Sequence, residues 1–514
     1  MKNKTRGRVT PITLGMGLAF LLASCLTSHA QRQGKSPGDR VDKVFKDAGI
    51  DKTTPGCAVA VIQKGRIVYE HGYGKADRDR GIDITPTTVF HAASLAKQFT
   101  AMSIMLLVKR GKLKLEDPVD KHIAVPIAVR PDGTHMTIGD MLRHISGIRD
   151  QWILVTLAGQ HLYEDVVTEE DVLRLVSQME SPDFEPRTDI LYSNTGYTLA
   201  GRIVEKISGK SLSEFAHEHI FRPLGMTHTK IIKKHDEVVE NRAYGYSQKP
   251  FQLWMPMLDV TGPTNLVTTV GDLARWNRNF DDKTVGGDAV LSQMQMPALL
   301  SNRRPARLGM DDDGNVIHYG LGLMLTTYRE RNVVEHDGRD AGYRAHLIRF
   351  RDLDFAVACL CNESLPEEKL PGKFARQIAD IYLDRRLGPA PRPNPQHPAR
   401  PHTPPTQHPP IDLTQFTGEY YSKEIDATYH VEQQDSSLVI KRRNYGDTRL
   451  KPATPASVAA RLFGIEEFAH ARAQPITDGT VQFEPHRGKI TGFSLTGLRF
   501  KLRRIDNFPF QKRP

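Results

Sequence analysis

Cysteine is scarce in this sequence, since 514 residues include only four. Cys359 and Cys361 lie two apart in the run Phe355–Cys361, whose alternation predicts a strand, and two residues on one face of a strand do not normally form a disulfide. We therefore predict no disulfide framework. Cys57, Cys359 and Cys361 are interpreted as small buried apolar residues.

A long apolar run is also missing after the first 30 residues, which argues against a membrane-spanning helix there. Residues 1–30 have the pattern of an export signal, because four basic residues precede the short apolar run 12–23. Ser28-His29-Ala30 fits signal-peptidase cleavage, whereas Leu22-Ala23-Ser24-Cys25 resembles a lipobox that would leave a lipid anchor on Cys25. We expect an exported protein, periplasmic or secreted, and favour cleavage after Ala30.

Metal-binding patterns are equally sparse. His217 and His219 lie two apart on a predicted helix and diverge, and Asp311–Asn315 resembles a hairpin turn without the ligands of a calcium loop. The formal net charge is +10, but four positive charges belong to the signal, so a nucleic-acid partner has little support. We expect no metal, no cofactor and no nucleic acid, and a small-molecule or short-peptide substrate.

Hydrophobic periodicity predicts an α/β (α+β) domain over residues 31–388. Strand-like runs at 57–63 and 66–73 open it, others follow between 321 and 361, and helical spacing lies between them. One antiparallel sheet built from both ends, flanked by helices and with an inserted all-helical region, accounts for this order. The proline-rich stretch 389–410 predicts a semi-rigid linker. Alternating runs at 428–433, 437–442, 480–485, 489–495 and 498–504 predict a small antiparallel barrel or sandwich in 411–514.

Ser94 and Lys97 form the stretch around which the chain is organised. They lie three residues apart at the start of a helix predicted to run to Gly111, so the hydroxyl and the amine project from one face. Backbone N–H groups and the positive end of the helix dipole add an anion-binding site there. The alternative is a helix cap beside a solvated lysine.

Two further motifs follow in order. Tyr192-Ser193-Asn194 enters a predicted helix, and His336-Asp337-Gly338 falls on a predicted strand. The order SxxK, YxN, HxG resembles the serine beta-lactamase-like and penicillin-binding-protein superfamily, which includes class C beta-lactamases, D-Ala-D-Ala carboxypeptidases, D-aminopeptidases and esterases. Other segments resemble the family over roughly 41–387, among them 117–119, 144–147, 184–186, 221–226 and 268–273. Some relatives carry a lipocalin-like domain, which the resemblance suggests for 411–514.

The resemblance implies an acyl-enzyme mechanism in which Ser94 attacks a carbonyl carbon. Lys97 or Tyr192 accepts the serine proton, and Asn194 orients Lys97 and the substrate. Cations such as Lys97 or protonated His336 would make the phenol of Tyr192 a better base.

The oxyanion hole implied by the family consists of the backbone N–H groups of Ser94 and Arg339. Gly338 would leave room for the substrate beside the strand. Three departures from the family pattern, at Arg187, Pro263-Thr264-Asn265 and Asp337, suggest an altered rim around the site.

His336 occupies the position of the lysine in the beta-lactamase KTG motif, and this favours peptidase or esterase activity. We expect turnover of carboxylate-bearing substrates to weaken as the pH rises through the pKa of His336. A class C-like beta-lactamase and a catalytically silent penicillin-binding-type protein remain alternatives. Gly34-Lys35-Ser36-Pro37-Gly38 matches the GxSxG motif of α/β-hydrolases by letter, but no strand precedes it.

Overall fold

The computed structural model describes Met1 and residues 36–126, 133, 135–390, 412–435, 437–444, 446–452, 462–465, 480–486, 489–496, 498–500, 503–505 and 508–513. The expected export signal, apart from Met1, and the linker beyond Ala390 lie outside these residues. Among the helices described, none is long and apolar enough to cross a membrane.

An eight-stranded antiparallel sheet forms the centre of the larger part of the chain, in the order β10-β11-β12-β13-β14-β15-β1-β2. The first and last segments of this part lie side by side, because β1 pairs with β15 along its whole length. The expected sheet built from both ends is therefore confirmed. The strands are β1 (Cys57–Gln63), β2 (Arg66–Tyr73), β10 (Gly309–Met310), β11 (Val316–Tyr319), β12 (Met324–Tyr328), β13 (Arg331–Asp340), β14 (Tyr343–Phe350) and β15 (Phe355–Cys361).

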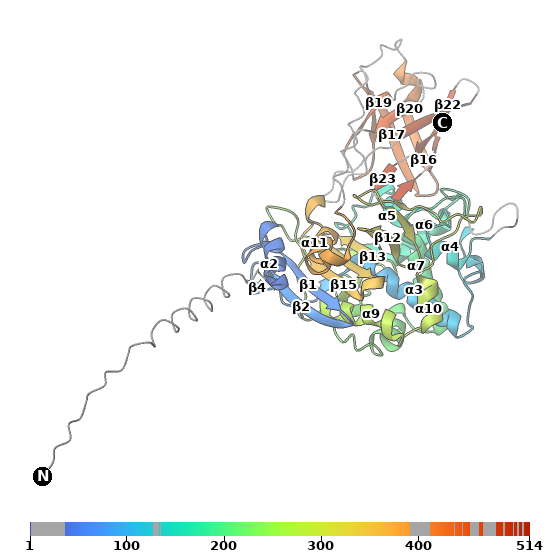
Figure 1. The fold of residues 1–514 in the computed structure, drawn as a ribbon. Helices are drawn as coiled ribbons and strands as arrows, with labels where there is room; N and C mark the ends of the chain where they lie inside the picture. Colours follow the sequence, from blue (N-terminus) through green and yellow to red (C-terminus); the bar gives the residue numbers. More distant parts are fainter. Residues whose placement is uncertain are drawn as a thin grey trace.

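Helices cover both faces of this sheet (Figure 1). On one face Val59 and Val357 pack in a core with the helices α2 (Pro37–Asp47) and α11 (Pro371–Leu383). On the other face the small side chains of Ala58 and Ala358 belong to the core of the helical region. Because both faces of the sheet are covered, β1 is buried along nearly its whole length. A strand in this position is apolar on both faces.

The helical region contains the helix that carries Ser94 and Lys97. It begins as a short 3₁₀ turn (Ala93–Leu95) and continues as α3 (Ala96–Lys109), close to the expected bounds. Residues 137–179 of this region contain three separate α-helices. The remaining helices of this region are α4 (Ile138–Leu142), α5 (Gln151–Leu157), α6 (Glu169–Gln178), α7 (Thr195–Ser208), α8 (Leu212–Ala216), α9 (Val270–Asp282) and α10 (Asp288–Met294).

A disulfide joins Cys57 to Cys361, so the prediction of no disulfide framework was wrong. The two residues are directly opposite each other on β1 and β15, with Cα atoms 4.0 Å apart. The prediction considered only the two cysteines of β15, whereas the partner is supplied from 304 residues away. Of the three cysteines in the part of the chain that the structure describes, Cys359 alone is the buried free thiol that was expected.

The C-terminal segment forms a closed antiparallel barrel, as expected. The run 498–504 is not one strand but a separate hairpin, β23 (Leu498–Phe500) and β24 (Arg503–Ile505). Buried aromatic rings pack together in the described part of the barrel, for example Phe493 on Phe510 at 4.6 Å between centroids. The barrel strands are β16 (Gly418–Ser422), β17 (Ala427–Gln434), β18 (Ser437–Lys441), β19 (Thr448–Pro452), β20 (Leu462–Ile465), β21 (Thr480–His486), β22 (Lys489–Thr496) and β25 (Phe508–Lys512).

Candidate active site

Ser94 and Lys97 face each other at the start of α3. The Nζ atom of Lys97 lies 3.0 Å from the Oγ atom of Ser94. Two carbonyl oxygens also accept hydrogen bonds from Nζ at 2.8 Å, the Oδ1 atom of Asn194 and the backbone oxygen of Pro263. Lys97 is completely buried, whereas Ser94 is partly exposed. A neutral amine has two N–H groups and one lone pair, so the two carbonyl oxygens can take both hydrogens and leave the lone pair for the hydroxyl of Ser94.

Asn194 is held in one orientation by Asp150. The Oδ2 atom of Asp150 accepts hydrogen bonds from the backbone N–H of Asn194 at 2.8 Å and from its Nδ2 atom at 2.6 Å. Because a carboxylate oxygen only accepts, the NH₂ group of the amide must face Asp150 and its oxygen must face Lys97. Asp150 also caps the N-terminus of α5.

Tyr192 lies beside the same amine. The Nζ atom of Lys97 is 4.9 Å from the centre of the Tyr192 ring. The ring of His144 packs against Tyr192 at 4.3 Å between centroids, and the ring of His336 lies at 6.3 Å. The structure thus brings the three motifs together around Lys97.

Burial favours the neutral form of the His336 imidazole. Its Nδ1 atom lies 2.6 Å from the backbone oxygen of Asp337 and its Nε2 atom 2.9 Å from the hydroxyl of Tyr319. The first contact assigns the hydrogen to Nδ1, so Nε2 accepts from the tyrosine. Burial, reinforced by the charge of Lys97, lowers the pKa of His336 to about 4, although Asp337 opposes this effect. The lowered pKa argues against the expectation that protonated His336 supplies a cation near neutral pH.

Gly338 lies where β13 approaches the turn that carries Ser94. A Cβ atom at this position would lie 2.2 Å from the backbone oxygen of Ala92. Ala93, next to Ser94, has a φ of 48°, a left-handed conformation that is unusual for a residue with a side chain. Close approach of two backbones is therefore one structural reason for glycine at 338.

Arg339 continues the strand beyond the reach of β12, which pairs with β13 only as far as Glu335. The side chain of Arg339 pairs with Asp337 at 3.1 Å and with Glu367 at 3.3 Å. Its expected contribution to an oxyanion hole involves only its backbone N–H.

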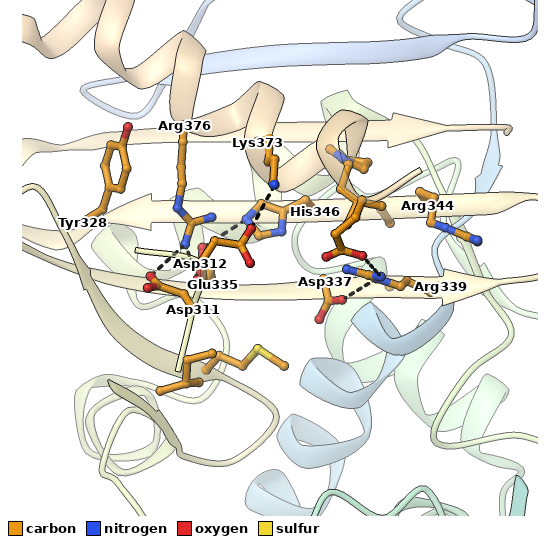
Figure 2. A pocket seen from close by; sticks show the side chains of 18 of the residues that line it. Asp311, Asp312, Tyr328, Glu335, Asp337, Arg339, Arg344, His346, Lys373 and Arg376 are labelled. Carbon is orange, nitrogen blue, oxygen red and sulfur yellow. Dashed lines mark hydrogen bonds and ion pairs between the residues drawn. The ribbon is translucent and has the colours of Figure 1, made fainter. Parts of the chain in front are cut away.

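The reverse face of β13 borders a cavity of about 560 Å³ under α11 (Figure 2). Glu335 pairs there with Arg376 at 2.8 Å and with His346 at 3.1 Å. Burial would raise the pKa of Glu335, but these two partners lower it to about 2. Asp312, in the expected hairpin turn between β10 and β11, pairs with Lys373 at 3.0 Å. Two ion pairs beside this cavity therefore attach α11 to its neighbours, one to β13 and the other to the turn between β10 and β11.

Several contact residues were not anticipated from the sequence. Asp150 follows the segment 144–147 that resembles the family, but nothing in the spacing marks it as a partner of Asn194. Tyr319 and the backbone oxygen of Pro263 are brought in by tertiary packing alone. Pro263 had been noted only as a departure from a glycine-rich stretch.

The antiparallel sheet, the helical region and the serine–lysine pair at the start of α3 place this protein among the serine hydrolases with a beta-lactamase-like fold. A family model described as Beta-lactamase matches residues 41–380. The chain therefore belongs to the beta-lactamase family.

Two curated relatives illustrate the similarity. Penicillin-binding protein 4* of Bacillus subtilis is 30% identical over 327 residues, which are 59% of this chain and 67% of the relative. A D-aminopeptidase of Gluconobacter oxydans is 26% identical over 311 residues, or 60% of this chain and 56% of the relative. The matched region thus covers only a little over half of the D-aminopeptidase.

Solved structures show the same fold. The octameric penicillin-binding protein homologue from Pyrococcus abyssi has a TM-score of 0.56 at 21% identity, covering 92% of this chain and 99% of that one. The D-amino acid amidase from Ochrobactrum anthropi SV3 has a TM-score of 0.56 at 22% identity, covering 68% of this chain and all of that one.

Proposed function

We propose that the protein hydrolyses the amide bond of D-aminoacyl amides or of short peptides with a D-residue at the cleaved bond, through an acyl-enzyme on Ser94. The observation that carries this proposal is the hydrogen-bonded group of Ser94, Lys97 and Asn194. Supporting observations are that relatives with 26% and 27% identity are named D-aminopeptidases and that one structural neighbour is named a D-amino acid amidase.

The reaction proceeds in two steps. The Oγ atom of Ser94 bonds to the substrate carbonyl carbon while its proton passes to Lys97 or Tyr192. The carbon–nitrogen bond then breaks, and the leaving amine takes the proton. Water attacks the resulting ester, which releases the acid and returns the proton to Ser94. The N–H groups of Ser94 and Arg339 stabilise the oxyanion in both steps.

The neutral state of His336 distinguishes amide or peptide substrates from beta-lactams. A lysine at this position would hold a substrate carboxylate with a permanent charge, whereas His336 carries no charge above its pKa of about 4. This favours D-aminoacyl amides over a class C-like beta-lactamase activity. Export of the protein is part of the proposal, and the buried Cys57–Cys361 disulfide supports it because disulfides persist in oxidising compartments.

Intact-mass analysis tests the proposal most directly. The full chain is incubated with a fluorophosphonate, with D- and L-alanine p-nitroanilide, and with a penicillin. We expect a single fluorophosphonate adduct and release of nitroaniline from the D-substrate, both lost in Ser94→Ala. The matched control is Ser103→Ala, which removes another serine hydroxyl of α3 that donates to the backbone oxygen of Phe99. An adduct that persists in Ser94→Ala, or equal turnover of both enantiomers, contradicts the proposal.

A further inference from the structure

The barrel contacts the catalytic region at the segment that immediately precedes α5 and at the end of that helix. The hydroxyl of Tyr429 on β17 donates a 2.8 Å hydrogen bond to the backbone oxygen of Leu157. The Nδ2 atom of Asn444 donates one of 3.1 Å to the backbone oxygen of Gly159. Figure 1 shows the barrel above α5 and α6. One end of the barrel therefore rests on the helix that Asp150 caps.

Arg149 lies at this interface with no exposed surface. Its guanidinium is 4.8 Å from the centre of the Phe508 ring of β25, and its Nε atom is 3.7 Å from a carboxylate oxygen of Glu424. On the catalytic side Ser181 accepts two hydrogen bonds from it at 2.9 Å, and Asp183 lies 3.9 Å away. A buried cation is stable only with such partners, and two of them, Glu424 and Phe508, belong to the barrel.

The backbone of Arg149 is connected to the catalytic motif. Its carbonyl oxygen accepts a 2.5 Å hydrogen bond from the hydroxyl of Thr195. The next residue, Asp150, holds Asn194 through two hydrogen bonds, and Asn194 in turn accepts a hydrogen bond from Lys97. Residues 149 and 150 therefore form a template on which residues 194 and 195 are placed.

We propose that the barrel is a positioning element for catalysis, and that Glu424 and Phe508 act through Arg149 and Asp150 to hold Asn194 in register with Lys97. Lys97 must present its nitrogen to Ser94 within hydrogen-bond distance, and small displacements of such groups reduce rates strongly. The barrel touches no reacting atom in this role. Glu424, Phe508 and Arg149 are positioning residues, and the inference rests on the proposed function of Ser94.

The test measures the rate of fluorophosphonate labelling of Ser94 together with kcat and KM for a D-alanine anilide. We expect Glu424→Ala and Phe508→Leu each to reduce the labelling rate and kcat at least tenfold with KM changed less than threefold. Glu424→Gln, which keeps the shape of the side chain and places an amide oxygen near the guanidinium of Arg149, should retain most of the activity. Lys423→Ala is the matched control, because Lys423 is the neighbour of Glu424 and forms an exposed ion pair across the same interface with Glu180.

A double-mutant cycle separates positioning from general stability. In an Asn194→Ala background, whose slow labelling is measured above the Ser94→Ala baseline, Glu424→Ala should lower the rate less than twofold further, because the connection is already broken. Equal rates for wild type and Glu424→Ala, the same loss in Lys423→Ala, or full additivity with Asn194→Ala would overturn the inference. If wild type is not labelled at Ser94, the proposed function itself fails, whereas normal labelling with unaffected barrel variants refutes only the positioning role.

Discussion

Burial of His336 makes the stability of the folded protein depend on pH. Its pKa is lowered by burial from 6.5 to about 4, while the unfolded chain keeps a value near 6.5. Above pH 6.5 the imidazole is neutral in both states. As the pH falls from 6.5 to 4, the unfolded chain binds the proton and the folded protein does not, so stability is lost. The difference in pKa corresponds to about 3 kcal/mol in the free energy of unfolding.

The perturbation that tests this is His336→Gln, because glutamine does not titrate but can still accept from Tyr319. Urea unfolding of wild type and variant is followed between pH 3.5 and 8. Other buried groups, such as His91, whose pKa is also lowered by burial, contribute equally to both proteins and cancel in the difference. We expect wild type to lose about 3 kcal/mol more than the variant across the window from pH 6.5 to 4. His430→Gln, at an exposed barrel position, is the control and should match wild type.

A difference curve that is flat across this range would refute the reasoning. A curve of opposite sign would mean that His336 is charged in the folded protein. The same pKa has a kinetic consequence. The expected decrease in the turnover of carboxylate-bearing substrates with rising pH moves from near neutrality to the region around pH 4. If kcat/KM of the wild type changes with pH around pH 6.5 and this change is absent in His336→Gln, the conclusion that His336 is neutral at this pH would be contradicted.

Replacing both Cys57 and Cys361 by alanine should lower the free energy of unfolding by up to about 5 kcal/mol, because their disulfide closes a loop of some 300 residues; unchanged urea unfolding would contradict this. Gly338→Ala should reduce kcat at least 100-fold, since its methyl group would meet the backbone oxygen of Ala92 at 2.2 Å. Gly271→Ala in α9, where the nearest neighbouring atom is 3.8 Å away, should instead be neutral or slightly stabilising. Equal activity of the two alanine variants would show that the close approach at 338 is unimportant.

Local pattern was enough to predict the strands that carry the sheet. The observed bounds of β1, β2 and β15 are those read from the alternating and apolar runs. These strands lie between clear turn signals such as Lys64-Gly65. The side chains of β1 and β15 are buried almost throughout, whereas those of the edge strand β2 are mostly exposed. The start of α3 was equally predictable, because the apolar spacing after Ser94 is regular.

Contacts between distant segments were not predictable in the same way. The spacing of Cys359 and Cys361 correctly excluded a disulfide between these two residues. The partner of Cys361 is Cys57, which lies opposite it only because β1 pairs with β15. Asp150 and Tyr319 hold Asn194 and His336 by hydrogen bonds that depend on tertiary packing. The burial of His336, which lowers its pKa, depends on the same packing.

The neutral imidazole changes how charge is distributed around Ser94. The amine of Lys97 lies on one side of the Asn194 amide and the carboxylate of Asp150 on the other. His336 contributes geometry, because Tyr319 joins it by a 2.9 Å hydrogen bond to a packed group of rings that includes His144 and reaches Tyr192. Tyr192 is therefore oriented by packing. A neutral Lys97 amine could accept the proton of Ser94 directly, because the two groups are 3.0 Å apart. A Tyr192 phenolate would first need a nearby positive charge, which a neutral His336 does not supply. Lys97 is therefore the better candidate for the base.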